Sequence, residues 1–484
     1  MIKFGTDGWR GLIARDFTYE NLGLVALATA QYVKKKNAEQ KRKRAPAVVI
    51  GYDTRFLSKE FAKEVALILA SEGVLVHLTD SVASTPQVSF HTKQKGVDIG
   101  IVITASHNPP EYNGFKLKAD FGGPATPQQI EQVELELAEI MKDKKKQQIK
   151  YDTLDSYIKS KKIRLFSAKE SYLRIIRKKI DVEAIRESNL RIIYDPMYGA
   201  GIDTLPALLP DVEEIHNELN PIFGEIHHPE PILDNLYPLK ERVIDGKFDI
   251  GIATDGDADR VGLIDETGEF VDSHHLFMIL LKYLYEVKRK RGIVVKTVSL
   301  TAMVDKYCEK KGLELRETPV GFKYSAEIMA QESGKVLIGG EESGGLGTIM
   351  HIPERDGLFN AMLLLEVMVT RKKSLRQLCN ELEAEFGTHR FMRRDETVTP
   401  AQKRTILANA EKLIAEANSS PSKLGKEAIL KTSTKDGFKF FFENAWLLIR
   451  ASGTEPLVRF YAEADSMGRV SELIEEGLKL AKSK

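Results

Sequence analysis

The chain has 484 residues and a formal net charge of +1 at pH 7, so it is long enough for several domains and gives no reason to expect nucleic acid or a membrane as a partner. With only two cysteines and no apolar core in its N-terminal segment, it resembles neither a disulfide scaffold nor a secreted precursor. No apolar run approaches the ~20 residues that span a bilayer, and these features together predict a cytoplasmic location.

Strand-like and helix-like stretches alternate from the start of the chain. Residues 47–51 predict a strand, Ser58 is expected to cap a helix that runs to about Ser71, and residues 74–78 predict the next strand. The alternation restarts at 190–194 and again at 293–295, which fits three α/β domains. We expect the highly charged segment 141–162 to join the first two domains.

Two basic runs, 34–36 and 41–44, stand close together near the N-terminus. Such runs can mark a nucleic-acid site. Because acidic residues balance the total charge, we expect them instead to be a solvated helix end and loop.

The segment Thr104–Pro109 follows an apolar stretch, 97–103, that predicts a buried strand. Ser106 would therefore stand in a loop at the end of that strand, where it could carry a phosphoryl group. Lys116 follows closely in the run Asn-Gly-Phe-Lys and would bring a cation. The alternative is an ordinary turn, since Asn-Pro favours turns.

Three aspartates, Asp255, Asp257 and Asp259, follow a second predicted buried strand at residues 248–253. Their spacing cannot place them on one face of a helix, but a loop can bring them together around a hard cation such as Mg²⁺ or Ca²⁺. An EF-hand loop is the competing interpretation, and Glu266 stands at its twelfth position. However, Arg260 occupies the sixth position, where that loop needs glycine, and the flanks predict strands. A Mg²⁺ site is favoured over a solvated acidic turn.

Two glycine-rich segments also follow predicted strands. Residues 339–345 offer Glu341 and Ser343, which suit sugar hydroxyls. Residues 450–456 offer a guanidinium, two hydroxyls and free backbone N–H groups, as a phosphate monoester requires. Each segment alone could be an ordinary turn. No Gly-Lys pair is followed by Ser or Thr as a phosphate-binding Walker loop requires, and Ser106 lacks the Gly-x-Ser-x-Gly context of a serine hydrolase.

These four motifs, together with the segment Gly5–Gly11, resemble the α-D-phosphohexomutase family in its order and over nearly the whole chain. The resemblance implies an α/β fold class with a four-domain phosphohexomutase-like architecture, in which three α/β domains with mixed sheets and a C-terminal α+β domain surround a central cleft. The expected domains are 1–166 with the phosphoserine loop, 167–269 with the metal loop, 270–384 with the sugar-binding loop and 385–484 with the phosphate-binding loop. The segment 387–394 is expected to be a hinge.

The resemblance further implies that Ser106 carries a phosphate and exchanges it with a phosphorylated hexose. Glucose 1,6-bisphosphate would be the intermediate and activator, and Mg²⁺ would be held by Ser106 and the three aspartates. His107 and Lys116 are candidates for general base and general acid, in either assignment, with Arg10 as a charge partner of the phosphoserine. The expected substrate-binding residues are Arg260, Gly321, Lys323, Glu341, Ser343, Arg450, Ser452, Gly453, Thr454 and Arg459. For Arg260 a structural ion pair with a neighbouring aspartate is the alternative.

One position departs from part of the family. Many phosphomannomutase and phosphoglucosamine mutase members have histidine after the Ser-Gly of the sugar loop, whereas this chain has Gly345. We therefore expect a phosphoglucomutase, with phosphomannomutase or dual activity as the alternative and phosphoglucosamine mutase as a more distant one. A phosphatase and a scaffold without catalysis are the remaining alternatives, and the intact serine, aspartates and phosphate loop count against a scaffold. A monomer or homodimer is expected.

Overall fold

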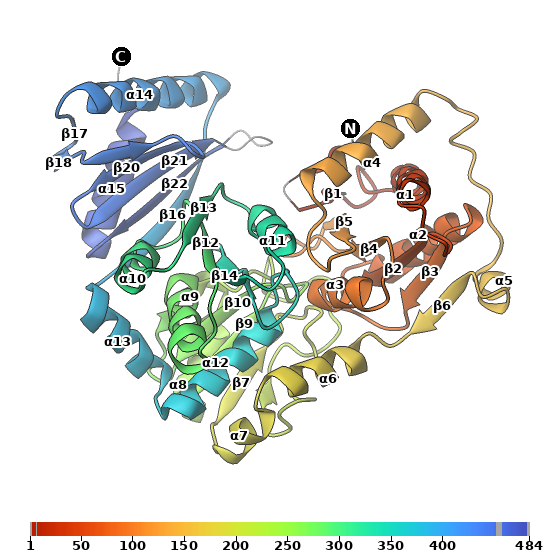
Figure 1. Ribbon diagram of the computed structural model, residues 1–484, viewed down its shortest axis with the longest axis horizontal. Helices are drawn as coiled ribbons and strands as arrows, with labels where there is room; N and C mark the ends of the chain where they lie inside the picture. Colours follow the sequence, from red (N-terminus) through yellow and green to blue (C-terminus); the bar gives the residue numbers. More distant parts are fainter. Residues whose placement is uncertain (1, 6, 452–456, 482–484) are drawn as a thin grey trace. The chain divides into compact units, whose positions relative to one another are not determined.

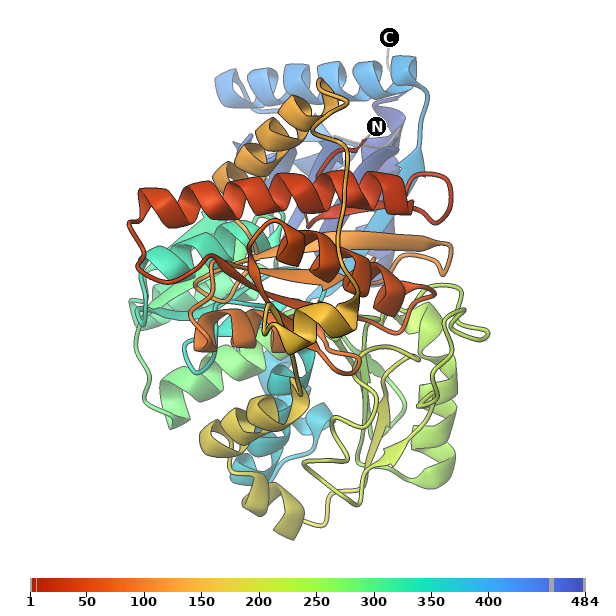
Figure 2. The same cartoon turned by 90° about the vertical axis from the view of Figure 1, so that its right-hand side faces the viewer.

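The computed structural model describes residues 2–5, 7–451 and 457–481. The chain divides into two compact units: Met1–Gly292 with Phe322–Gln377, and Ile293–Gly321 with Leu378–Lys484. Figures 1 and 2 show the elements of both units. Within the described residues, no helix is both long enough and apolar enough to cross a membrane.

The first sheet has six strands in the order β1-β5-β4-β2-β3-β6. β2, β3, β4 and β6 run parallel, whereas β5 is antiparallel to β4 and β1 is antiparallel to β5. The strands are β1 (Trp9–Leu12), β2 (Ala47–Tyr52), β3 (Leu75–Thr79), β4 (Ile99–Ile103), β5 (Tyr112–Ala119) and β6 (Ile163–Phe166). The predicted strands at 47–51, 74–78 and 97–103 are confirmed.

Helices cover both faces of this sheet, and its central parallel strands β2 and β4 are accordingly buried along their whole length. In β2, Val48 and Ile50 pack into the core on the side of α1 and α2, whereas Ala47 and Val49 face a smaller core with Val88 of α3. Helices α1 and α4 lie side by side (Figures 1 and 2). The helices are α1 (Tyr19–Glu39), α2 (Ser58–Ser71), α3 (Thr85–Gln94), α4 (Pro127–Met141) and α5 (Leu154–Lys159).

The predicted helix at 58–71 is confirmed, but the role expected for Ser58 is wrong. Leu57 is the N-cap residue, with φ of +61° and no side-chain cap, and Ser58 is the first helical residue. The Ser58 hydroxyl instead donates to Oδ1 of Asp53 at 2.6 Å. The nearby carboxylate competes with the backbone for this hydroxyl, which local sequence could not indicate.

The basic runs are not simply solvated. Lys36 is buried, and its Nζ donates to the carbonyl of Asp98 at 3.0 Å and lies 3.2 Å from a carboxylate oxygen of Asp120. Arg42 and Arg44 both form ion pairs with the fully buried carboxylate of Asp98. A buried charge requires such partners. These three cations lie around Asp98, directly before β4, and the predicted solvated helix end and loop is wrong for them.

The charged segment 141–162 leads into β6, which belongs to the first sheet. The link to the second sheet therefore begins after Phe166, and the prediction that 141–162 joins the first two domains is wrong. The signal was misleading because α5 and β6 are only six and four residues long, so the charged residues around them dominate the segment.

The second sheet has the order β11-β10-β9-β7-β8 and is also mixed. β9 runs parallel to β7 and antiparallel to β10, with Thr254 opposite Val261 in the register. The loop with the three aspartates is thus the connection of a β-hairpin. The elements are β7 (Ile192–Asp195), β8 (Glu213–Glu214), β9 (Ile250–Thr254), β10 (Val261–Asp265), β11 (Phe270–Val271), α6 (Lys169–Lys179), α7 (Val182–Glu187), η1 (Leu233–Asn235) and α8 (Tyr237–Gly246).

The remaining elements of the first unit surround a short antiparallel pair, β14 (Val336–Gly340) and β15 (Leu346–Thr348). The glycine-rich segment 341–345 connects these two strands. The helices are α9 (Ser273–Lys282), its π-helical continuation η2 (Tyr283–Val287), α11 (Phe322–Gln331) and α12 (Gly357–Arg371). Helix α12 is buried over most of its length, as its apolar sequence requires.

The second unit contains the parallel pair β12 (Ile293–Thr297) and β13 (Leu315–Thr318) with helix α10 (Met303–Lys311). It also contains an antiparallel sheet, β16-β22-β21-β20-β19, with one face covered by α14 and α15. Helix α13 (Leu375–Phe386) enters this unit. The remaining elements are β16 (Arg390–Thr397), α14 (Pro400–Ser419), β17 (Lys423–Leu424), β18 (Glu427–Ala428), β19 (Lys431–Ser433), β20 (Phe438–Phe442), β21 (Ala445–Ala451), β22 (Leu457–Ala464) and α15 (Met467–Lys479).

The expected hinge at 387–394 overlaps a regular strand. Residues 390–394 belong to β16, which pairs with β22 from Arg390 to Thr397. Of the expected hinge, Gly387, with φ of +84°, and the two residues after it lie before the strand begins. The part of the expected hinge that lies outside the strand is therefore 387–389, and the hinge itself stays a prediction.

Candidate active site

The structure places Ser106 at the carboxyl end of β4, in a tight turn. Its φ is +54°, in the left-handed region that few residues other than glycine adopt. Its backbone N–H donates to Oγ1 of Thr104 at 2.8 Å, and its hydroxyl donates to Oδ2 of Asp255 at 2.9 Å. Ser106 is almost fully buried. The serine and one of the three predicted metal-binding aspartates are therefore direct neighbours.

Arg55 holds the serine loop through its backbone. The guanidinium donates to the carbonyl of Ser106 at 2.7 Å and to that of Pro109 at 2.8 Å, and it also reaches the carbonyls of Asn108 and Tyr112. Asp53 neutralises it at 3.2 Å. Burial lowers the pKa of Arg55 to about 10. The sequence motifs did not include Arg55, although it follows β2, the parallel neighbour of β4, where strand ends meet.

We expect Arg55→Ala to lower the stability of the protein by about 3–5 kcal/mol, because it leaves Asp53 without a buried partner. A shifted serine loop should also reduce kcat on the order of 100-fold. Urea unfolding and steady-state kinetics measure the two effects. Arg15→Ala, at an exposed arginine, is the control. Equal behaviour of the two variants would contradict a clamping role.

The three aspartates converge in the β9–β10 connection. They are fully buried, and one ligand oxygen from each can be chosen so that all lie within 4.8 Å of one another. The backbone N–H groups of Asp259 and Arg260 donate to Oδ1 of Asp255 at 2.9 and 3.0 Å, which shapes the loop. A Cβ on Gly256 would stand 2.4 Å from the carbonyl oxygen of Ser106, so glycine lets the metal loop and the serine loop touch.

The free oxygens of the triad fit a divalent cation. Oδ1 of Asp257 and Oδ1 of Asp259 are buried and have no hydrogen-bond partner among the described residues. The other oxygens of these carboxylates accept from Lys116 and Arg355. Burial and the charges of Asp259 and Asp257 raise the pKa of Asp255 well above its ordinary value. A hard cation among these oxygens would satisfy them and relieve that repulsion.

Lys116 lies among carboxylates. Its Nζ lies 2.7 Å from Oδ2 of Asp257 and 2.8 Å from Oδ2 of Asp7. Burial opposes its charge, but Asp257, Asp7 and Asp259 raise the pKa of Lys116 above its ordinary value, so it is protonated. Asp7 belongs to the N-terminal motif but was not among the predicted site residues.

His107 and Arg10 also reach the serine loop. Nδ1 of His107 lies 3.4 Å from Oγ of Ser106. Burial, with the cations Arg260 and Arg10 nearby, lowers the pKa of His107 well below its ordinary value, so the ring is neutral. Arg10 lies on β1 and donates to Oδ1 of Asn108. His107 and Arg10 thus contact the serine loop, whereas Lys116 contacts the metal loop through Asp257.

The sugar-binding candidates lie in the β14–β15 connection. Oε1 of Glu341 accepts from the Ser343 hydroxyl at 2.9 Å and from the Arg355 guanidinium at 3.0 Å. Arg260 forms an ion pair with Glu230 at 2.7 Å and a longer one, at 3.9 Å, with the neighbouring Asp259, so the structural ion pair given as the alternative for this residue is present.

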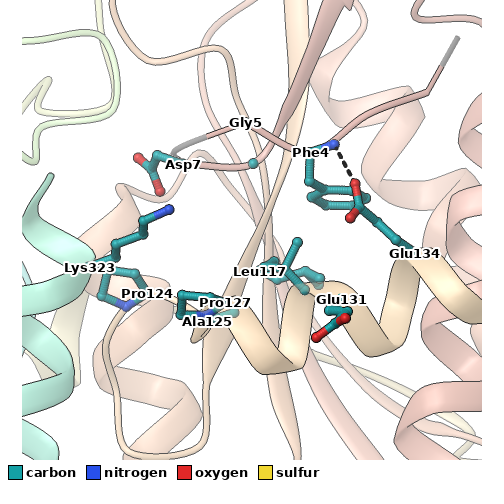
Figure 3. Close-up of a pocket in the computed structure, with 12 residues that line it drawn as sticks. Phe4, Gly5, Asp7, Leu117, Pro124, Ala125, Pro127, Glu131, Glu134 and Lys323 are labelled. Atoms are coloured by element: carbon teal, nitrogen blue, oxygen red, sulfur yellow. Dashed lines mark hydrogen bonds between the residues drawn. The ribbon is translucent and has the colours of Figure 1, made fainter. Parts of the chain in front are cut away.

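Lys323 and Asp7 line a small cavity of about 170 Å³ (Figure 3). Figure 3 shows the Lys323 side chain extending toward the carboxylate of Asp7, with Phe4 and Leu117 elsewhere on the wall. Gly321, with φ of +124°, lies in the second unit, just before the residues of α11. Lys323 is thus placed close to a carboxylate that also pairs with Lys116.

The predicted phosphate clamp lies in the second unit. Arg450 is the last residue but one of β21 and faces Arg459 of β22 in the register. Nε of Arg450 donates to Asp436 at 2.8 Å, and Nε of Arg459 lies 3.3 Å from a carboxylate oxygen of Asp395. Ser452, Gly453 and Thr454 lie outside the described residues. The two described arginines come from adjacent strands at one edge of the loop.

Comparison with known proteins agrees with this geometry. Four models of phosphoglucomutase/phosphomannomutase domains match the chain: α/β/α domain I at residues 1–144, domain II at 170–268, domain III at 272–386 and the C-terminal domain at 397–479. A phosphoglucomutase/phosphomannomutase from Thermococcus kodakarensis is 31% identical, over 99% of this chain and 98% of its own. The chain belongs to the phosphoglucomutase/phosphomannomutase family.

Two further relatives show how the family varies. A phosphoglucosamine/phosphogalactosamine mutase from Sulfurisphaera tokodaii is 30% identical, over 99% of each chain. A crystal structure from Thermus thermophilus, of a protein assigned as a phosphomannomutase, is 32% identical, with a TM-score of 0.84 and coverage of 100% of this chain and 99% of the other. The four-domain fold class and the enzyme class, a phosphohexomutase of the isomerase type, are confirmed. The exact domain boundaries stay a prediction.

Proposed function

We propose that this phosphohexomutase is a phosphoglucomutase that interconverts glucose 1-phosphate and glucose 6-phosphate. The observation that carries the mutase chemistry is the contact between the buried Ser106 hydroxyl and Asp255, beside two aspartate oxygens that have no hydrogen-bond partner in the described part of the chain. A nucleophile and a site for a divalent cation are thus joined. This is the pairing that phosphoryl transfer needs, since a cation neutralises charge on the phosphoryl oxygens.

In the proposed cycle, phosphorylated Ser106 transfers its phosphoryl group to the free hydroxyl of the sugar phosphate. The bond from Oγ to phosphorus breaks, a new sugar oxygen–phosphorus bond forms, and glucose 1,6-bisphosphate results. The intermediate then turns over and returns its other phosphate to Ser106. The same bisphosphate would activate enzyme that has lost its phosphate.

Two side chains can move the protons of this exchange. In each transfer the attacking hydroxyl loses its proton and the oxygen that leaves phosphorus gains one. Neutral His107, beside Oγ of Ser106, can accept the proton of that hydroxyl when the phosphate returns to the serine, and protonated Lys116 can donate the proton that the leaving oxygen takes up. Arg10 supplies a positive charge beside the loop. Mg²⁺ would be held by Asp255, Asp257, Asp259 and the phosphorylated Ser106. The contacts described above support the placement of these side chains and not that of the metal or the phosphate.

The substrate must bind in two orientations, so we propose two fixed clamps. Glu341 and Ser343 hold sugar hydroxyls, with Lys323 and Gly321 alongside, and Arg260 braces the metal loop or touches phosphate. The phosphate that is not reacting binds the second clamp, whose members are Arg450, Ser452, Gly453, Thr454 and Arg459. Because that phosphate would bind the same side chains each time, one phosphate clamp would serve both half-reactions.

Glucose is favoured by Gly345, since histidine stands there in many mannose- and glucosamine-phosphate members. Phosphomannomutase or dual activity is the second candidate, supported by the names of the relatives. A coupled assay with the 1-phosphates of glucose, mannose, glucosamine and N-acetylglucosamine decides between them. A higher kcat/KM for any sugar other than glucose would overturn the proposal. The cytoplasmic location and the monomeric or homodimeric state stay predictions.

Changes in the two clamps should have different effects. Arg450→Ala is expected to weaken glucose and mannose phosphates together, by about 1.5–3 kcal/mol, because it removes a charge-assisted contact to the shared phosphate. Glu341→Ala should instead change the ratio of kcat/KM between the two sugars. Arg404→Ala, at an exposed arginine of α14, is the control. If Arg450→Ala changes the sugar ratio and Glu341→Ala does not, the two roles are reversed.

A further inference from the structure

Arg355 contacts three carboxylates that come from distant parts of the chain. Its guanidinium donates to Asp7 at 2.7 Å, to Asp259 at 2.5 Å and to Glu341 at 3.0 Å. Its side chain is only 7% exposed. Burial opposes the positive charge of Arg355, but the carboxylates of Asp259, Asp7 and Glu341 outweigh burial and raise the pKa of Arg355 above its ordinary value. It belongs to none of the sequence motifs.

Gly345 provides the space that this side chain occupies. A Cβ on Gly345 would stand 2.2 Å from Cδ of Arg355, 2.9 Å from its Cγ and 3.0 Å from Oε1 of Glu341. The φ of Gly345 lies outside the left-handed region, so other residues could adopt its backbone conformation. The glycine is therefore needed for room and not for its flexibility.

We propose that Arg355 is a positioning residue that couples the sugar-binding loop to the metal loop, and that Gly345 is the position that permits this coupling. The proposal rests on the role of Glu341 in sugar binding proposed above. A guanidinium has a rigid fork of donors and can hold two carboxylates at fixed angles, which a lysine ammonium cannot. The orientation of Glu341 and that of Asp259 thus depend on one side chain.

The two carboxylate oxygens of Asp259 connect Arg355 to the candidate metal site. Arg355 occupies Oδ2 of Asp259, whereas Oδ1, in the buried triad, has no hydrogen-bond partner among the described residues and only a long ion pair, at 3.9 Å, with Arg260. A carboxylate held by one oxygen presents the other in a fixed direction. Partners that orient metal ligands in this way typically contribute about 10–100-fold in metal affinity.

The test uses Arg355→Lys and Gly345→Ala, because both keep a positive charge at position 355. Arg355→Lys removes the forked guanidinium, and the Cβ of Gly345→Ala displaces the Arg355 side chain, with Oε1 of Glu341 as its other neighbour at 3.0 Å. We expect each to weaken Mg²⁺ binding to the full-length protein about tenfold, measured by isothermal titration calorimetry. Each should also change the kcat/KM ratio of glucose and mannose 1-phosphates. Gly468→Ala is the matched control, since a Cβ there meets no atom within 4 Å.

A double-mutant cycle isolates the contact between the two positions. Gly345→Ala should have no further effect on Mg²⁺ affinity, within about twofold, once Arg355 is replaced by alanine. An equal effect in the presence and absence of Arg355 would overturn the proposal, and so would unchanged Mg²⁺ binding in both single variants. Gly345→Ala removes no polar group, so it keeps the test decisive if Arg355→Lys folds poorly.

The Mg²⁺ titrations need no sugar, and this separates the two proposals. If the wild type turned over no glucose phosphate, the proposed substrate would be wrong, yet the Mg²⁺ effect of Gly345→Ala would still test the contact with Asp259. If Mg²⁺ binding weakens and the sugar ratio does not change, Arg355 supports only the metal loop and the coupling is wrong.

Discussion

Ser106→Ala is expected to abolish mutase turnover, with a loss in kcat/KM on the order of 10⁴-fold or more. The oxygen that would carry the phosphoryl group is then absent, so the two-step route itself is lost and not merely slowed. The variant should fold normally, because the Arg55 clamp binds the backbone of the loop and not the serine side chain.

Intact-mass measurement provides a second readout for Ser106. Freshly purified wild type should contain a fraction that is heavier by one phosphate, and the alanine variant should contain none. Glucose 1,6-bisphosphate should restore activity to dephosphorylated wild type but not to the variant. Ser81→Ala, at an exposed serine before α3, is the control. Near-normal turnover in Ser106→Ala would refute its assignment as the phosphoryl carrier.

Removal of the divalent cation is expected to have a comparably large effect. An excess of chelator should abolish turnover and added Mg²⁺ should restore it. Asp257→Asn should weaken Mg²⁺ binding by at least about 100-fold, because one of the charges that balance the cation is lost. Calorimetric titration measures this affinity without substrate.

Asp245→Asn is the matched control for that variant, since Asp245 is exposed at the end of α8. High Mg²⁺ concentrations should partly rescue Asp257→Asn, because weaker binding can be offset by mass action. Full activity of the wild type in excess chelator would exclude a catalytic role for the triad.

Much of the candidate site could be predicted because its polar and charged residues are close together in the sequence, in short contiguous segments. Ser106 and the three aspartates follow buried apolar strands. A short apolar run bounded by turn residues is the sequence pattern of such a strand. The two strands, β4 and β9, belong to different sheets, and the loops at their carboxyl ends meet, as the contact between Ser106 and Asp255 shows.

Other parts of the site could not be predicted because they depend on tertiary contacts. Arg355 has no local motif, and its partners Asp7 and Glu341 stand 348 and 14 residues away in the chain. The basic residues near α1 were misjudged for the same reason, since the buried carboxylate of Asp98 that binds Arg44 stands 54 residues later. A charge run indicates solvent only when no buried counterion is near.

The antiparallel pairing of β1 with β5 has a consequence for the order of folding. The ribosome makes Trp9 long before its partner Phe115, so β1 cannot pair until β2, β3, β4 and β5 have been synthesised. Asp7 waits longer still for Arg355. No early fragment of the nascent chain can therefore assemble a phosphoryl-transfer centre, and catalytic competence arises only after residues from both ends of the first unit have been synthesised.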